Sequence, residues 1–194
     1  MKPLDGTVAY HDLMTTTQHG SSSTENGTGE YTIFLEKDYV YGIDATVDKY
    51  ISLSYYVDTK EIDSTHIKTI DLYLFPIQVG TVIPLDNLFF KVSSATILPE
   101  SATELNRISK MLLEYPAMKL KITGYTDNTG TDALNQKLSL ERAEAVKKYF
   151  VSKGLSERHF EVVGLGNAHP VASNASAAGR QKNRRVEITI VNVQ

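Results

Sequence analysis

The chain has 194 residues, of which 41% are hydrophobic and 22% are charged, as is typical of a globular protein. Cysteine is absent, which excludes disulfides and cysteine-bound zinc. No run of 18 apolar residues is present, so the sequence predicts no membrane-spanning helix, and residues 1–6 lack the apolar segment of a signal peptide.

Charge divides the sequence into two parts near Pro84. Residues 1–84 contain 5 Lys, no Arg and 12 acidic residues, for a net charge of −7. Residues 85–194 contain 15 basic and 11 acidic residues, for a net charge of +4. This asymmetry predicts two domains with different surfaces, and we expect them to cover residues 1–80 and 81–194.

The first domain is expected to be a small all-β sandwich. Short runs of β-branched and aromatic residues are separated by Gly, Asp and Lys, and no stretch keeps a helical period. The expected strands cover residues 7–10, 31–35, 39–43, 50–56 and 71–75. Residues 15–29 are rich in Ser, Thr and Gly, which predicts a mobile loop, and residues 76–84 are expected to connect the domains.

The second domain begins with an expected strand over residues 87–90. Ser101 and Glu104 have the spacing of a capping box, in which each side chain bonds the backbone of the other, so a helix is expected to start there. Leu105, Ile108 and Leu112 recur on one face of this helix, and a following proline ends it.

Alternation over residues 118–122 predicts a half-buried strand, which a polar loop over residues 124–130 follows. Ser139 is the expected N-cap of a second helix, whose end Gly154 marks, and residues 160–163 and 186–193 are expected strands. The order β-α-β-α-β-β favours a mixed sheet with helices on one face. The whole chain is therefore expected to be α+β.

Several motifs of the second domain resemble the OmpA C-terminal-like family, which includes outer-membrane proteins, Pal lipoproteins and the MotB-type stator subunits of the flagellum. The similar residues are Phe89-Phe90, Pro99-Glu100-Ser101, the loop Gly124-Tyr125-Thr126-Asp127-Asn128-Thr129-Gly130, Asn135, Leu138-Ser139, Arg142-Ala143, Gly164-Leu165-Gly166, Pro170 and the run from Gly179 to Val186. The resemblance covers about 110 residues. Tyr125 departs from it, since many members have His there.

The resemblance implies non-covalent binding of the peptide stem of peptidoglycan through meso-diaminopimelate. It implies that Asp127 holds the ligand's ammonium group and that Arg142 holds its carboxylate. Asn135, Thr129 and Gly130 match supporting positions, and Arg184 or Arg185 matches the pocket edge. The chemistry is consistent, because an acceptor-only carboxylate and a two-pronged guanidinium complement a zwitterion. Without the resemblance, Asp127 would be read as a turn residue and Arg142 as a solvated helix residue.

Other kinds of site are excluded or weakly indicated. Counting from Asp127, Asp132 and Leu138 stand where a calcium loop needs Gly and Glu. The five His have no metal-ligand spacing, Gly164-Leu165-Gly166 lacks the third glycine of a dinucleotide site, and no nucleophile elbow is present. We therefore expect no catalytic residue, metal or cofactor. The charge of +4 is too small to indicate nucleic acid.

The first domain resembles, less specifically, the carboxypeptidase-regulatory-like or transthyretin-like β-sandwich that often precedes OmpA-like domains in Bacteroidetes-type envelope proteins. The similar residues are Gly6 to Tyr10, Gly29 to Leu35 and Tyr41 to Ala45. A spacer without a ligand is the favoured interpretation, since a fold alone assigns no function.

Together these features predict a fragment of a periplasmic, peptidoglycan-associated protein of the cell outer membrane that is not an enzyme. Any membrane attachment is expected from missing parts of the parent protein. Two alternatives stay open: a peptidoglycan-processing enzyme, and a structural interaction module whose pocket has lost its ligand.

Overall fold

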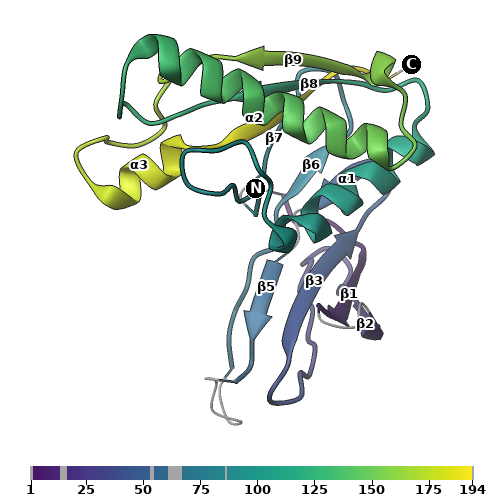
Figure 1. Cartoon of the computed structure of the whole chain (residues 1–194). Helices are drawn as coiled ribbons and strands as arrows, with labels where there is room; N and C mark the ends of the chain where they lie inside the picture. The colour runs from purple at the N-terminus through teal and green to yellow at the C-terminus, as the bar shows by residue number, and fades with distance from the viewer. Residues whose placement is uncertain (1, 14–16, 53–54, 61–66, 86, 194) are drawn as a thin grey trace. The chain divides into compact units, whose positions relative to one another are not determined.

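The structure is a computed structural model, which describes residues 2–13, 17–52, 55–60, 67–85 and 87–193. The chain forms two compact units, Met1–Pro76 and Ile77–Gln194. The units divide four residues before the expected boundary, because residues 77–84 contribute a strand to the sheet of the second unit. The fold is mixed α+β, as the sequence predicts, and each unit is described here by itself (Figure 1).

Unit 1 contains a four-stranded antiparallel sheet and a two-stranded one. The larger sheet has the order β2-β1-β3-β5, from β1 (Thr7–Asp12), β2 (Gln18–Ser23), β3 (Val40–Thr46) and β5 (Tyr55–Asp58). The smaller sheet pairs β4 (Tyr50–Ser52) with β6 (Leu74–Pro76). Val8, Ile43 and Val57 form the buried core of this unit.

Two expectations for unit 1 are wrong. Part of the expected mobile loop is strand β2, because its polar residues pair with β1 through backbone hydrogen bonds that need no apolar side chain. The expected strand over residues 31–35 is not a strand, although Tyr31, Ile33 and Leu35 pack against the core. The run of β-branched and aromatic residues thus contributes to the core, but it does not pair as a strand.

One further expected strand of unit 1 is divided in the structure. Residues 50–56 contribute to β4 and β5, and residues 53–54 lie outside the described residues. The two strands belong to different sheets, so the chain changes partner within this segment.

Unit 2 is built on a mixed four-stranded sheet with the order β7-β10-β8-β9. Only β8 and β9 are parallel among its pairings. Its elements in chain order are β7 (Val82–Pro84), the 3-10 turn η1 (Pro99–Ser101), α1 (Ala102–Glu114), β8 (Lys119–Gly124), α2 (Asp132–Ser152), η2 (Glu157–His159), β9 (Phe160–Gly164), α3 (Ala177–Asn183) and β10 (Val186–Asn192).

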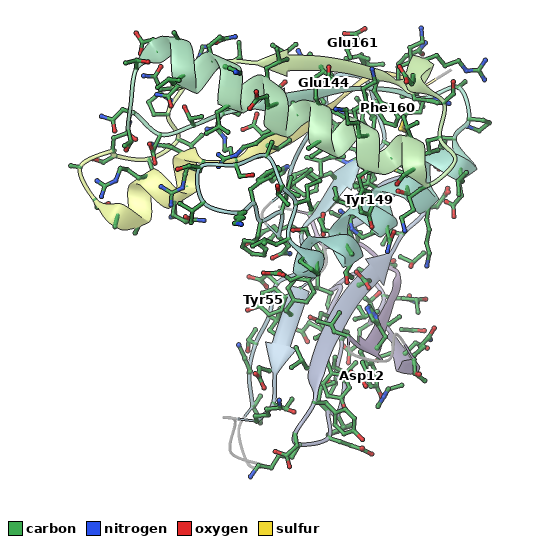
Figure 2. The ribbon with its side chains drawn as sticks, in the orientation of Figure 1. Asp12, Tyr55, Glu144, Tyr149, Phe160 and Glu161 are labelled. Atoms are coloured by element: carbon green, nitrogen blue, oxygen red, sulfur yellow. The ribbon has the colours of Figure 1, made fainter. Side chains whose placement is uncertain are left out.

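The core of unit 2 lies between this sheet and two helices. Leu120 and Ile122 of β8 and Ile188 and Ile190 of β10 are fully buried, as alternate residues on one face of a sheet must be. Helix α2 packs on β8 and β9 and contacts α1 (Figure 1). Phe160 lies beside the C-terminal turns of α2, where it stacks on the ring of the buried Phe150 (Figure 2).

Of the two expected N-caps in unit 2, Ser101 has the expected position without the expected bond, and Ser139 is wrong. Ser101 precedes α1 but makes no capping bond, because its hydroxyl donates to the carbonyl of Phe89 and accepts from the Phe89 amide. Helix α2 begins two turns earlier than expected, at Asp132, and its N-cap is Thr131, whose hydroxyl accepts from the Leu134 amide. Ser139 is buried inside this helix.

Three elements of unit 2 differ from the expectation for other reasons. The expected strand over residues 87–90 is reduced to one isolated bridge, between Phe90 and Ile97. Strand β7 and helix α3 were not expected, since β7 has three residues and α3 carries no apolar stripe to reveal it. Across the residues described, no helix combines the length and the apolar character needed to cross a membrane.

Candidate functional site

Asp127 lies in the loop that follows β8, and the protein occupies both of its carboxylate oxygens. Oδ1 accepts from the backbone amide of Thr129 at 2.8 Å, and Oδ2 pairs with Nη1 of Arg184 at 2.6 Å. The Asp127 side chain is 8% exposed, whereas that of Arg184 is 37% exposed. Asp127 is therefore a turn residue, as it would be read without the resemblance, but its carboxylate also forms an ion pair with Arg184.

The pKa of Asp127 lies below that of an ordinary carboxyl group. Burial by itself raises this pKa, but the hydrogen bond from Thr129 and the pairing with Arg184 outweigh that effect. The group is therefore an anionic acceptor at neutral pH.

Arg142 lies in the middle of α2 and is 6% exposed, not in a first helical turn as expected. Its Nε donates to the carbonyl of Ser94 at 3.1 Å, and its guanidinium lies 5.1 Å from the ring centroid of Phe90. The pKa of Arg142 is lowered by burial and by the positive charge of Arg184, and the negative charge of Asp127 opposes this shift. The three groups therefore influence one another electrostatically. Within the described part of the chain the Nη atoms of Arg142 make no hydrogen bond, so they are free donors.

The supporting positions are placed less uniformly. Gly130 has φ of 90°, a left-handed conformation that favours glycine at the end of this loop. Asn135, one turn into α2, is buried, and its Nδ2 has no partner among the described residues; the same holds for Oγ1 of Thr126. Buried polar atoms without partners are rare, and they are concentrated at functional sites and around bound water.

Close packing beneath the loop fixes its position. Ser139 Oγ donates to the Gln136 carbonyl and accepts from the amide of Gly166, both at 2.9 Å. A Cβ added to Gly124 would lie 2.1 Å from the Ser139 carbonyl oxygen, and one added to Gly164 would lie 2.5 Å from the Leu140 amide. These two glycines allow α2 to touch the ends of β8 and β9, which places Arg142 beside the Asp127 loop.

The backbone of Arg184 is held by α3 and its neighbours. The Asn183 side chain is fully buried, accepts from the amides of Val171 and Ala172, and donates to the Ala172 carbonyl and to Asn174. The Arg184 amide donates to the Arg180 carbonyl at 3.1 Å. These bonds fix the backbone from which the Arg184 side chain reaches Asp127.

A second cluster at the same end of the sheet was not predicted as a unit. The Arg185 guanidinium lies 3.8 Å from the ring centroid of Tyr125, its Nε pairs with Glu187 at 2.7 Å, and its Nη2 donates to the His169 carbonyl. Burial, followed by the charge of Glu187, raises the pKa of Tyr125. Phe90 and Ser94 were likewise not predicted as partners of Arg142, because they lie about 50 residues away and only folding brings them together.

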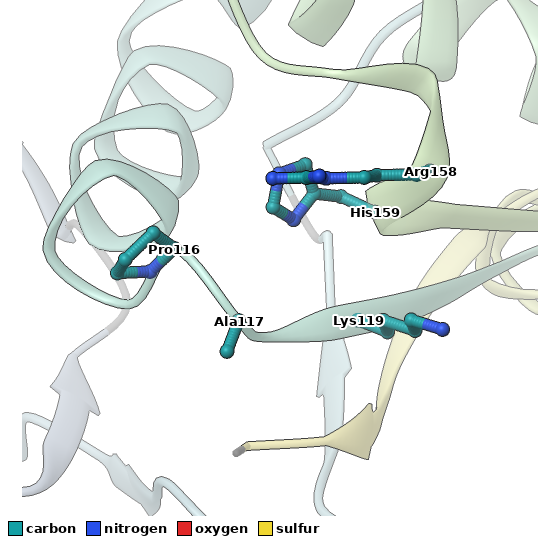
Figure 3. Close-up of a pocket in the computed structure, with 5 residues that line it drawn as sticks. All are labelled: Pro116, Ala117, Lys119, Arg158 and His159. Atoms are coloured by element: carbon teal, nitrogen blue, oxygen red, sulfur yellow. The ribbon is translucent and has the colours of Figure 1, made fainter.

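A separate basic pocket lies at the other end of β8. Pro116, Ala117, Lys119, Arg158 and His159 line it (Figure 3). Lys119 begins β8 and Asp127 follows its last residue, so the strand alone separates the two places by roughly 16 Å. Elsewhere among the residues described, no group of three His, Asp or Glu side chains could hold a metal ion.

The arrangement at Asp127 suits a ligand that carries both charges. The carboxylate offers acceptors, and the Nη atoms of Arg142 offer parallel donors for a carboxylate. The site therefore belongs to an α+β domain with a mixed sheet, in which the buried Asp127 and the buried Arg142 lie near the C-terminal end of β8.

Comparisons with known proteins agree with this class. Residues 89–184 match the OmpA family. The chain is 42% identical over 105 residues to "Probable lipoprotein YiaD" of Escherichia coli (strain K12), covering 54% of this chain and 48% of that protein. It is 44% identical over 101 residues to "Peptidoglycan-binding protein ArfA" of Mycobacterium tuberculosis (strain ATCC 25618 / H37Rv), covering 52% and 31%.

A solved structure extends the comparison to the fold. "The structure of the cell wall anchor of the T6SS from Pseudomonas aeruginosa" is similar with a TM-score of 0.51 and 34% identity, covering 60% of this chain and 85% of that one. The chain thus spans about half or less of the length of the two curated relatives. The segment that matches the OmpA family lies entirely within unit 2.

Proposed function

We propose that the OmpA-family domain binds the peptide stem of peptidoglycan through diaminopimelate and so anchors a larger envelope protein, non-covalently, to the cell wall in the periplasm. The observation that carries this proposal is the proximity of the buried Asp127 acceptor to Arg142, whose Nη donors are free among the described residues. The relatives include a protein named as peptidoglycan-binding and one described as a cell wall anchor, which supports the same class of ligand.

In this proposal each of the predicted residues has a distinct part. Asp127 accepts from the ligand's ammonium group, and Arg142 donates to the adjacent carboxylate. Asn135 supplies a polar group on α2, and Thr129 and Gly130 shape the loop that presents Asp127. Unit 1 serves as a spacer between this domain and the rest of the parent protein.

The test is co-sedimentation of the purified chain with peptidoglycan sacculi. We expect Asp127→Asn and Arg142→Gln each to weaken binding about tenfold or more, because each removes a charge-assisted hydrogen bond. Glu161→Gln and Arg158→Gln remove the same charges from surface positions outside the site and are expected to bind like the wild type. Circular dichroism establishes that the variants are folded.

The same assay separates the alternatives. Wild-type protein that stays in the supernatant would refute peptidoglycan binding and favour an interaction module with a non-functional pocket. Release of soluble muropeptides from the sacculi would instead indicate a peptidoglycan-processing enzyme. Comparison of sacculi that contain diaminopimelate with sacculi that contain lysine at this position tests the stem-peptide specificity.

A further inference from the structure

Each oxygen of the Asp127 carboxylate already has a protein partner in the free chain. Thr129 occupies Oδ1 and Arg184 occupies Oδ2, and the side chain is only 8% exposed. The bond to Thr129 is part of the backbone turn and is fixed with the loop. Each oxygen could accept a second hydrogen bond, but a cationic ligand group that forms an ion pair with this buried carboxylate competes with Arg184, which already holds Oδ2 at 2.6 Å.

The Arg184 side chain can leave Asp127 without disturbing the fold, because its backbone is fixed while the side chain reaches solvent. The preceding Asn183 is fully buried and bonded on all sides, and the Arg184 amide closes the last turn of α3. The Arg184 side chain is 37% exposed, and its Nη2 also donates to Oε1 of Gln181. Gln181 thus remains as a partner when Nη1 leaves Asp127.

The charges around Asp127 make this replacement depend on the whole ligand. One carboxylate and two guanidinium groups, from Arg142 and Arg184, give the free site a net charge of +1. A simple amine is repelled by this positive charge and has no acceptor that could pair with Arg142. A simple carboxylate can pair with Arg142 while Arg184 stays on Asp127. A ligand with both groups neutralises Arg142 and frees Arg184.

We propose that Arg184 is an internal substitute for the ligand's ammonium group, which occupies Asp127 in the free protein and makes the site select amino-carboxylate zwitterions over amines or carboxylates alone. This inference rests on the proposed function and changes the role that the resemblance implied for Arg184, from a ligand contact to a competitor. Since the fraction of molecules with Asp127 available scales the apparent affinity, Arg184 lowers affinity for the ligand's amino group.

Calorimetric titration of the full chain with three small probes tests this role. The probes are meso-diaminopimelate, pimelate, which is the same diacid without amino groups, and cadaverine, a diamine without carboxylates. The wild type is expected to bind diaminopimelate best and cadaverine least. In Arg184→Gln, affinity for diaminopimelate should rise roughly twofold to tenfold, the range expected for removing a half-exposed competing ion pair. Affinity for pimelate should fall or stay constant, because a positive charge is lost.

Two controls make the result specific. Arg158→Gln removes a positive charge at the other end of β8 and is expected to change neither affinity. In the wild type, the NMR signals of the Arg184 side chain should shift on saturation with diaminopimelate but only weakly with pimelate. Backbone amide spectra verify that Arg184→Gln keeps the fold.

The opposing outcomes are distinct. Weaker or unchanged binding of diaminopimelate by folded Arg184→Gln would overturn the inference while leaving peptidoglycan binding intact, since Arg184 would then be a ligand contact or a bystander. A wild type that binds neither diaminopimelate nor sacculi would refute the proposed function, and this inference with it.

Discussion

At the residue scale, the proposed site differs in how far its two key side chains, Asp127 and Arg142, are already hydrogen-bonded within the protein. Asp127 is bonded at both oxygens, whereas Arg142 uses only its Nε within the described residues. In the proposed site, the donors for a ligand carboxylate are therefore unoccupied among the described residues, whereas Arg184 occupies the acceptor proposed for an ammonium group. This asymmetry is a property of side-chain geometry, since the same residues in an extended chain would all be equally solvated.

The acid titration of Asp127 gives a prediction with a definite sign. Because its folded pKa is below its unfolded value, the stabilisation that it provides is fully present above the unfolded carboxyl pKa of about 4 and is lost as the pH falls through the folded value. Urea unfolding of the wild type and of Asp127→Asn should therefore differ by a constant amount from about pH 5 to pH 7. The difference should shrink only in more acidic solution; a difference that grew on acidification would contradict the assignment.

Close packing at Gly124 gives a second prediction at this scale. Gly124→Ala places a Cβ about 2 Å from a backbone oxygen of α2, so we expect a loss of about 2 kcal/mol or more in the free energy of unfolding. Gly154→Ala is the matched control, because nothing lies within 4 Å of its Cβ and only its φ of 90° is strained. It should cost about 1 kcal/mol. Equal losses in denaturant titrations would show that α2 does not approach β8 so closely.

At the element scale, α2 is the part that joins core and site. Its inner face carries Ala143, Val146 and Phe150 into the core, while Arg142 interacts electrostatically with Asp127 of the loop after β8. The helix starts at Asp132, with its N-cap Thr131 directly after that loop, so the loop length and the helix register are fixed together. A shift of the helix start by a few residues would rotate Arg142 away from Asp127.

The hydroxyl groups of Thr131, the observed N-cap of α2, and Ser139, the expected one, have different roles that substitution can distinguish. Thr131→Ala removes the N-cap and should cost about 1 kcal/mol of stability. Ser139→Ala leaves the buried amide of Gly166 without its acceptor and should cost up to about 3 kcal/mol. Chemical denaturation of both variants measures the difference, and a larger effect of Thr131→Ala would argue against the buried role of Ser139.

At the scale of the whole molecule, every residue of the proposed site belongs to unit 2. The acid, both arginines and the turn that supports them lie between residues 90 and 187. Unit 1 has a core of its own and contributes none of these groups. The two units therefore differ in charge, and the proposed ligand site lies in the basic one.

This division predicts that the site is autonomous. A fragment of residues 77–194 should fold and bind sacculi with the affinity of the full chain, within about twofold, since no charge in the site comes from unit 1. A fragment of residues 1–76 should not sediment with sacculi. Pull-down titrations with both fragments measure this, and loss of binding by the longer fragment would assign unit 1 a part in recognition.

Much of the fold followed from local pattern. Alternation predicted β8, and the apolar spacing of Leu105, Ile108 and Leu112 predicted α1, because a buried face imposes its own period on the sequence. Where a segment is polar, short or held by distant groups, the pattern is silent or misleading. Strand β2 is rich in serine, and β7 has three residues whose pairing depends on β10.

The sequence by itself determined the mixed α+β class, the charge division and, through resemblance, the candidate residues of the site. Only the tertiary structure decided that Arg184 pairs with Asp127, 57 residues away, and that Ser94 and Phe90 hold Arg142 from 48 and 52 positions before it. Neighbours along the chain fix helices and strands through backbone geometry, but an ion pair depends on side chains that meet only after the sheet and α2 have packed. For that reason, the identities of the charged groups were readable in advance, whereas their partners were not.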